Sequence, residues 1–384
     1  MLEQLESLPW STLTHAYGSA SDVPQQIRAL ASGDRDTRER ALWELYGNIF
    51  HQGTRYQATP YAIPFFYELV GTPSTPDKND IIYLLVHLAL GYEEYYLPDG
   101  LDPVAFRRTL TEAEQQLSAD DRAACAEYGY GPRIDIDCYD AVRQGVSTLI
   151  RLLDDDDLQV RSAAAYALAW FPEDSAISLP RLLRRLDQET EHVTLATLIL
   201  TISLLARAST VALNVEKLDS FLFHHRLLIR VAAAIGLARE PLERRIIDIL
   251  IEAILTPEQL QAESAGVRFN EGNLAGYASL VLARYGATNR EQIVPVLCQT
   301  LRGVNAYQSL DVTRALLELI VVDSTTPIRN VPVDQLDMLQ RQTLRAIADY
   351  GGWRIDDAIF ANYSELVRAY GLPDSKEALQ RYLN

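Results

Sequence analysis

Histidine, cysteine and the acidic residues are the side chains best suited to bind a metal ion or to move a proton. The chain has six histidines, and no two of them stand four residues apart, the spacing that would place two metal ligands on one face of a helix. His224 and His225 are adjacent, so a helix would point them in different directions. Three cysteines (Cys125, Cys138 and Cys298) form neither a disulfide framework nor a zinc site. We therefore expect no metal ion and no cofactor.

Motifs for nucleotide binding and for covalent catalysis are also absent from the sequence. It contains no phosphate-binding loop, no dinucleotide-binding fingerprint and no nucleophile elbow. The 52 acidic residues are so numerous that no pair of them stands out as a general acid and base. The sequence therefore predicts a protein that is not an enzyme.

A short polar connection at residues 47–60 has an unusual density of hydrogen-bonding side chains. Gly53 is expected to end the helix before it, and Pro60 to begin the helix after it. One interpretation is a clasp that joins two neighbouring helix pairs, and the other is a protein-binding site. The candidate binding residues in this connection are Asn48, His51, Gln52 and Tyr56.

Residues 92–140 form a second break, which is acidic and rich in tyrosine. Tyrosine combines a large contact area with a polar tip and is enriched at protein interfaces, so this segment suits a basic protein partner. The alternative is an irregular helix pair whose tyrosines pack on the rest of the fold. The candidate binding residues here are Tyr92, Tyr95, Tyr96, Tyr128 and Tyr130. A third break, residues 260–273, is polar with two glycines, and we expect a mobile loop there.

These breaks lie between pairs of predicted helices. The clearest pair spans residues 141–171. Apolar residues recur there at helical spacing on both sides of the polar run 154–157. Asp157 is placed to cap the second helix, because its carboxylate can accept bonds from free amides of the first turn. Pro172 follows the second helix and ends it.

Residues 152–168 resemble the HEAT-repeat pattern. In that family an Asp closes the turn between paired helices and a Val-Arg pair begins the second helix, positions that correspond here to Asp157 and Arg161. Arg38 and Arg230 stand in the same phase, and we expect all three arginines to brace the turns between helices. Residues 41–69 and 362–373 resemble a group of bacterial HEAT-repeat proteins of the PBS-lyase-HEAT-like type.

The resemblance and the helical periodicity together predict an all-α fold, an α-α superhelix of stacked antiparallel helix pairs similar to HEAT and armadillo solenoids. We expect Trp43, Trp170, Trp353 and His87 to lie in the core. The predicted organisation is one solenoid over residues 1–384, with N-terminal repeats at 1–91, the acidic insertion at 92–140, HEAT repeats at 141–322 and a C-terminal helical cap at 323–384.

Composition and charge limit the classes of partner that the sequence allows. Hydrophobic residues make up 48% of the chain and charged residues 23%, as in ordinary globular proteins. The formal net charge of −17 repels phosphate backbones, which disfavours nucleic acid. No apolar run approaches the roughly 20 residues of a membrane helix, and the N-terminus lacks the pattern of a signal peptide. We expect a cytoplasmic monomer.

The leading hypothesis is a non-catalytic scaffold that binds another protein with a basic surface. A specific version is an immunity or inhibitor role, in which an acidic surface neutralises a basic toxin or nuclease. The alternative is an enzyme on a HEAT-like fold, of the lyase, hydroxylase or glycosylase type.

Overall fold

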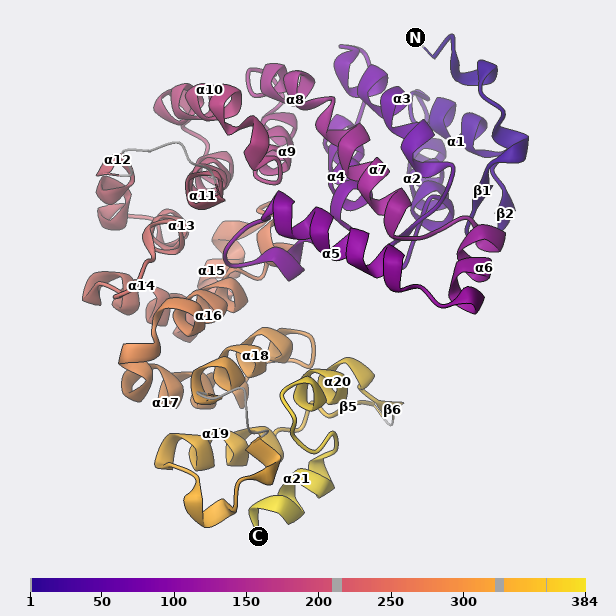
Figure 1. Ribbon diagram of the computed structural model, residues 1–384. Helices are drawn as coiled ribbons and strands as arrows, with labels where there is room; N and C mark the ends of the chain where they lie inside the picture. The colour runs from indigo at the N-terminus through magenta and orange to yellow at the C-terminus, as the bar shows by residue number, and fades with distance from the viewer. Residues whose placement is uncertain (1, 209–215, 322–327, 357) are drawn as a thin grey trace. The chain divides into compact units, whose positions relative to one another are not determined.

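The structure is a computed structural model that describes residues 2–208, 216–321, 328–356 and 358–384. The chain divides into two compact units, Met1–Leu213 and Asn214–Asn384, and each is described by itself. Helices α1 to α21 account for most of the described residues, and the described strands are three two-stranded antiparallel hairpins (Figure 1). The all-α class is therefore confirmed.

The first unit contains eleven α-helices and two hairpins in its described residues. Its elements are β1 (Thr14–His15), β2 (Gly18–Ser19), α1 (Val23–Ala29), α2 (Arg35–Asn48), β3 (Phe50–His51), β4 (Thr54–Arg55), α3 (Thr59–Gly71), α4 (Lys78–Leu90), α5 (Pro103–Gln116), α6 (Ala119–Tyr128), α7 (Pro132–Arg143), α8 (Val146–Leu152), α9 (Leu158–Leu168), α10 (Ser175–Gln188) and α11 (His192–Ala208). Short 3-10 helices include Glu93–Tyr96, after α4.

Consecutive helices pack against each other as the pairs α1–α2, α3–α4, α8–α9 and α10–α11. The second helices α4, α9 and α11 pack side by side, and small residues such as Ala163, Ala164 and Ala165 of α9 are completely buried between them. The hydroxyl of Thr201 in α11 donates to the carbonyl oxygen of Ala165, at 2.9 Å. Small residues at this contact let neighbouring helices approach closely.

The tyrosine-rich insertion consists of three helices, α5, α6 and α7. Helix α7 packs on α3 and α4 on one side and on α5 on the other, so α5 lies outside α7 (Figure 1). Asp102 caps α5 and Ser118 caps α6 through their side-chain oxygens. Tyr139 of α7 is fully buried, and its ring contacts both Phe106 of α5 and Phe171, which follows α9, so the insertion shares its core with the neighbouring helix pair.

The second unit is also built from packed helix pairs, with α16 between α14 and α18, and α19 against α17 and α18. Its elements are α12 (Glu216–Asp219), α13 (Leu227–Leu237), α14 (Arg244–Leu255), α15 (Pro257–Ser264), α16 (Leu274–Tyr285), α17 (Arg290–Leu301), α18 (Gln308–Ile320), α19 (Met338–Asp349), β5 (Arg354–Ile355), β6 (Ala358–Ile359), α20 (Ala361–Ala369) and α21 (Lys376–Leu383). The expected boundary between the repeats and the C-terminal cap, at residues 322 and 323, lies outside the described residues.

Three expectations about individual segments are wrong. Trp43 is 76% exposed, because it lies two positions from both Ala41 and Leu45 and therefore on the opposite side of α2 from the buried stripe. His87 is half-buried rather than enclosed in the core. Residues 260–273 are not an open loop: they include the end of α15 and a 3-10 turn at Phe269–Gly272, and Phe269 is fully buried.

Trp170 and Trp353 are buried as expected. Across the described parts of both units, no helix is long and apolar enough to cross a membrane.

Candidate functional site

The polar connection after α2 folds as the β3–β4 hairpin. Phe50 pairs with Arg55 and His51 pairs with Thr54, which leaves Gln52 and Gly53 as the turn. Both turn residues have positive φ, 51° and 85°. A Cβ at Gly53 would lie 2.6 Å from the Tyr92 ring, so glycine is required there by both backbone and space. Helix α2 already ends at Asn48, so Gly53 shapes a hairpin turn and not a helix end.

The insertion docks against this hairpin, so the first and second breaks of the sequence meet in space. Tyr56 and Tyr130 form an isolated antiparallel bridge, and the Gln57 amide donates to the Gly129 carbonyl at 2.8 Å. Arg55 forms a 2.9 Å ion pair with Asp135 of α7, and its side chain is only 6% exposed. Burial raises the pKa of Asp135 to about 6, although the nearby Arg55 guanidinium acts in the opposite direction. These contacts fix the hairpin rigidly on the insertion.

Aromatic rings lie on both faces of the hairpin, because Phe50 and His51 are successive residues of β3 and their side chains point to opposite faces. The rings of Tyr17 and His51 lie 5.4 Å apart, and the Tyr17 hydroxyl is 3.3 Å from His51 Nδ1. The ring of Phe50, beside His51, lies 6.0 Å from Tyr92, which in turn lies 6.0 Å from Tyr95. Tyr17 is 69% exposed and Tyr95 71%. We call this set the hairpin surface: Tyr17, His51, Gln52, Tyr92 and Tyr95.

The other tyrosines predicted as binding residues face different ways. Tyr56 is buried, and Tyr130 is half-buried with its ring 6.4 Å from that of Tyr56. Tyr96 is half-buried against Phe106 at 6.1 Å. Tyr128, at the end of α6, is 57% exposed. The clasp interpretation therefore describes Tyr56 and Tyr130, whereas Tyr95 and Tyr128 are available for contacts.

A buried carboxylate attaches the start of the insertion to α4 and α9. Glu93 is 4% exposed, and the Tyr166 hydroxyl donates to its Oε1. His87 Nε2 lies 3.6 Å from Glu93 Oε2, beyond direct hydrogen-bond distance, while Tyr46 Oη and His87 Nδ1 are 2.9 Å apart. This chain of groups joins four elements, α2, α4, the 3-10 helix Glu93–Tyr96 and α9, through contacts within the fold, which is a structural role.

Asn48, the remaining predicted residue of the first break, is not part of the hairpin surface. It is the last residue of α2 and is 9% exposed. Its Nδ2 donates to Asp22 Oδ2 at 3.0 Å and to Gln26 Oε1 at 3.2 Å. Asn48 therefore belongs to a polar cluster between α1 and α2.

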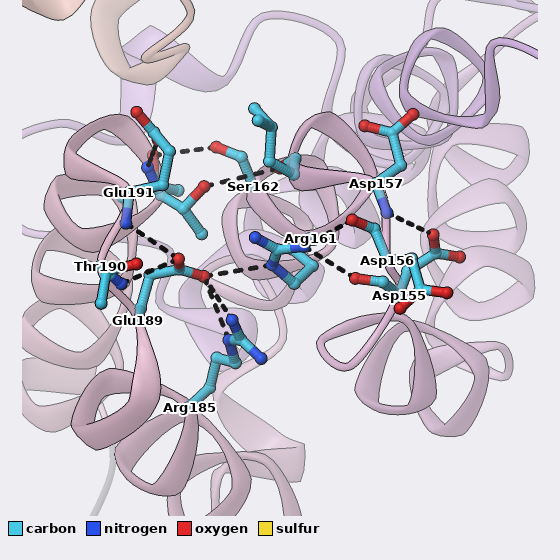
Figure 2. A network of polar contacts seen from close by, with 12 residues as sticks. Asp155, Asp156, Asp157, Arg161, Ser162, Arg185, Glu189, Thr190 and Glu191 are labelled. Atoms are coloured by element: carbon cyan, nitrogen blue, oxygen red, sulfur yellow. Dashed lines mark hydrogen bonds and ion pairs between the residues drawn. The ribbon is translucent and has the colours of Figure 1, made fainter.

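Arg161 lies between two turns, as Figure 2 shows. Its Nη1 donates to the carbonyl oxygens of Asp155 and Asp156, both at 2.9 Å, and its Nε donates to Glu189 at 3.1 Å. Asp157 accepts from the Gln159 amide at 2.8 Å, which is the capping geometry that the sequence predicts.

Glu189 is the acceptor at the centre of this network, and its side chain is 2% exposed. Burial alone would raise the pKa of Glu189, but bonds from the Glu191 amide, from Arg161 and Arg185 and from the Thr190 amide outweigh it and lower the pKa. The carboxylate is therefore held in its charged form within the fold.

Arg38 and Arg230 make the same kind of contact. Arg38 donates to the Ser32 carbonyl, six residues before it, and to Asp77. Arg230 donates to the carbonyls of His224 and His225 and to Glu252.

In the first unit, ion pairs join one second helix to the turn before the next. The pairs are Arg38–Asp77, Lys78–Asp155 and Arg161–Glu189, which connect α2, α4, α9 and α11 in order. We call this series the charge ladder. Sequence reasoning identified two of its cations, but it missed Lys78 and all three of these acidic partners.

The described residues hold no cluster of three or more His, Cys, Asp or Glu side chains arranged to bind a metal ion. The three cysteines are free thiols, and burial raises the pKa of each.

Comparison with known proteins identifies no family and a weak structural similarity. No protein-family model matches the chain, and no curated protein matches it. A crystal structure of an engineered protein from the Northeast Structural Genomics Consortium is similar at 16% sequence identity, over 94% of this chain and 97% of that chain. The TM-score is 0.33, and a likeness this weak carries no argument about fold or function.

Proposed function

We propose that this chain is a non-catalytic protein-binding scaffold of the HEAT-repeat type, which recognises a partner with a basic surface through the hairpin surface of its first unit. The observation that carries the proposal is the meeting of two sequence breaks at one place, with the rings of Tyr17 and Tyr95 presented outward. The charge ladder and the stacked second helices α4, α9 and α11 support the repeat assignment.

A rigid aromatic platform favours binding because little freedom remains to be lost on association. Tyrosine has only two side-chain torsions to freeze, and it contributes apolar area together with a hydroxyl. The backbone beneath these rings is held by the Arg55–Asp135 ion pair and by the Gln57–Gly129 hydrogen bond. The hairpin surface is therefore pre-organised for contact.

Charge selects the class of partner. Residues 92–140 contain twelve Asp and Glu against four Arg, and Glu112, Asp120 and Glu127 of α5 and α6 are exposed. This acidic field attracts a positively charged protein and raises its association rate. A basic partner would therefore be steered by the insertion and held by the tyrosines.

The acidic groups beneath this surface favour binding over catalysis. Asp135 is ion-paired with Arg55, and Glu93 accepts a bond from Tyr166. Both carboxylates are engaged in holding the insertion in place, whereas the exposed groups of the hairpin surface are mainly aromatic.

The test compares partner retention by three forms of the full chain: wild type, the double variant Tyr17→Ala/Tyr95→Ala, and the control Tyr307→Ala. Tyr307 is 68% exposed and belongs to the second unit, so its loss removes a similar ring from a different surface. In a quantitative pull-down from native cytoplasm, the double variant should lose a partner that the control retains. With that partner purified, calorimetry should show binding weakened about tenfold, or 1.4 kcal/mol.

Kinetics at two salt concentrations test the charge component, since the association rate should fall more than the dissociation rate rises as salt increases. A melting curve checks that the double variant is folded. If the folded double variant retains every specific partner of the wild type, the hairpin surface is not the binding site and the proposal fails.

A further inference from the structure

A polar groove of about 510 Å³ lies between α1 and α2 of the first unit. The side chains that line it include Asp22, Gln25, Gln26, Arg40, Glu44 and Asn48. Asn48 was predicted as a binding residue, yet it contributes to this groove and not to the hairpin surface. The groove therefore needs its own explanation.

Three donors hold Asp22: Gln26 and His15 lie four and seven residues away in the sequence, and Asn48 lies 26 residues away. Gln26 Nε2 and Asn48 Nδ2 donate to its Oδ2, at 2.9 and 3.0 Å, and His15 Nε2 lies 2.9 Å from its Oδ1. The Tyr17 amide donates to His15 Nδ1 at 3.0 Å, so Nδ1 is an acceptor and the ring proton is on Nε2. His15 is 6% exposed, Gln26 7% and Asn48 9%, whereas the Asp22 side chain is 47% exposed. Buried groups thus orient a carboxylate that remains open to the groove.

The orientation of the Asn48 amide follows from the same contacts. A carboxylate can only accept, so the atom facing Asp22 must be the NH₂ group of Asn48. That NH₂ group also donates to Gln26 Oε1 at 3.2 Å. Among the described residues no donor reaches Asn48 Oδ1, so a side chain that is nine-tenths buried keeps an open acceptor at the groove.

The groove therefore offers acceptors: Asp22, Glu44 and the Asn48 carbonyl oxygen. A donor complements these acceptors, and the two carboxylates favour one with positive charge; a guanidinium group has five N–H donors in one plane. Arg40 also lines the groove and is exposed, so it opposes a cation there. We infer that the α1–α2 groove is a binding subsite for an arginine side chain of a protein partner.

This inference deepens the proposed function and rests on it for the identity of the ligand. The groove adjoins the hairpin surface, because Asn48 precedes β3 by two residues and His15 is hydrogen-bonded through its ring to Tyr17. A basic partner seated on the tyrosines could place one arginine between α1 and α2. That arginine would explain why three buried side chains orient Asp22.

The test uses acetyl-arginine-amide as the probe and acetyl-citrulline-amide as its neutral, nearly isosteric control. The readout is the side-chain NH₂ resonances of Asn48 and Gln26 in the deuterated, ¹⁵N-labelled full chain. The arginine probe should shift both resonances saturably, with affinity at least about tenfold above that of citrulline. Asp22→Asn should weaken arginine binding about tenfold, and Arg40→Ala should strengthen it about twofold.

Asp36→Asn is the matched control, because Asp36 is an exposed carboxylate of α2 that does not line the groove. If Asp22→Asn does not fold, Glu44→Gln takes its place, with an expected weakening of about threefold. Equal shifts by arginine and citrulline, the absence of a saturable shift, or equal effects of Asp36→Asn and Asp22→Asn would each overturn the inference.

The probe needs no partner, so the two proposals can fail separately. Loss of the partner from the Tyr17→Ala/Tyr95→Ala variant without arginine binding would leave the hairpin surface standing and remove the groove. Arginine binding together with full partner retention by that variant would support the groove as an arginine site and remove the hairpin surface as the partner-binding site.

Discussion

The β3–β4 hairpin of the first unit and the third break of the second unit are both polar segments with glycine, but their side chains are placed in opposite ways. Both segments place non-glycine residues in the left-handed region: Gln52 with φ 51° in the first, and Asn270 with φ 53° and Glu271 with φ 52° in the second. Gln52 is exposed at the hairpin turn, whereas Asn270 is 4% exposed and Phe269 beside it is fully buried. The hairpin turn leaves Gln52 exposed, whereas the third break directs Asn270 and Phe269 into the fold.

A buried acceptor accounts for the difference. Asp311 of α18 accepts at Oδ2 from Asn270 and Asn273, both at 2.8 Å. A Cβ at Gly276 would lie 2.0 Å from Asp311 Oδ2, so the lack of a side chain at this position makes room for the carboxylate. The third break is thus folded around one carboxylate and anchored by one phenyl ring. Among the described residues, the β3–β4 turn has no such acceptor beneath Gln52. The Gln52 side chain is therefore exposed.

The largest expected effect tests the inward segment. Asn270→Ala removes bonds to Asp311 and to the Asn273 carbonyl and puts alanine in a left-handed conformation that asparagine tolerates better. Chemical unfolding should show stability lowered by about 3 kcal/mol. Gln52→Ala, at nearly the same φ but exposed, should change it by less than about 0.5 kcal/mol. Equal losses of stability from the two substitutions would show that the buried Asn270 contributes no more to the fold than the exposed Gln52.

The second effect concerns pH. Burial raises the pKa of Asp311 to about 6 from 3.8, and the bonds from Asn270 and Asn273 only partly oppose this. A raised folded pKa means that the folded state holds the proton more tightly than the unfolded state between these pH values. Asp311 therefore favours folding below about pH 4, and this contribution is lost as pH rises through about 6.

Asp311→Asn cannot lose this proton. Relative to the variant, the wild type should lose about 2 kcal/mol of stability between pH 4 and pH 7, measured by urea unfolding at each pH. Asp135, whose pKa is also raised to about 6, is present in both proteins and cancels in the difference. A difference that stays constant over this range would show that Asp311 does not titrate there.

The third effect separates adjacent tyrosines within the first unit. Tyr96 packs on Phe106 and is half-buried, so Tyr96→Ala should lower the unfolding free energy by about 1.5 kcal/mol. Tyr95→Ala should cost less than about 0.5 kcal/mol, because the ring is 71% exposed. Thermal and urea unfolding of both variants check this. Equal losses would place Tyr95 in the core of the insertion and not on the hairpin surface.

Local chemistry in the sequence predicts the helix pairs, the Asp157 cap and the positions of Arg38, Arg161 and Arg230, because each depends on residues within about one turn or helix. The hairpin surface depends on contacts between residues that are far apart in the sequence. Tyr17 was missed because its place is set by His51, 34 residues away. The Asp22 cluster joins His15, Gln26 and Asn48 across two helices, and no local period marks it.

The third break did carry a signal that could have been used. Its Asn270 and Asn273 flank Glu271 and Gly272, and asparagine and glycine are the residues that most readily adopt left-handed backbone. Leu260, Val267 and Phe269, the large apolar residues of this mostly polar run, are all buried and indicate an anchored segment rather than an open loop. The identity of the acceptor, Asp311, could not be read from the sequence, because it lies 41 residues further along the chain.

The sharpest comparison includes the smallest expected effect, that of Gln52→Gly, since it makes one substitution at two sites with nearly the same backbone. Glycine relieves the cost of left-handed φ, about 1–2 kcal/mol for an ordinary residue, but adds roughly 0.5–1 kcal/mol of unfolded-state entropy. At Gln52, which makes no buried contact, the balance should stabilise the first unit by about 0.5 kcal/mol. At Asn270 the same change removes two hydrogen bonds and should destabilise the second unit by about 2 kcal/mol. Urea unfolding of Gln52→Gly and Asn270→Gly measures both. Opposite signs mean that Asn270 is kept for its side chain and that the β3–β4 turn tolerates strain at Gln52. A stabilising Asn270→Gly would show that the bonds to Asp311 contribute nothing net, and the two breaks would then differ only in exposure.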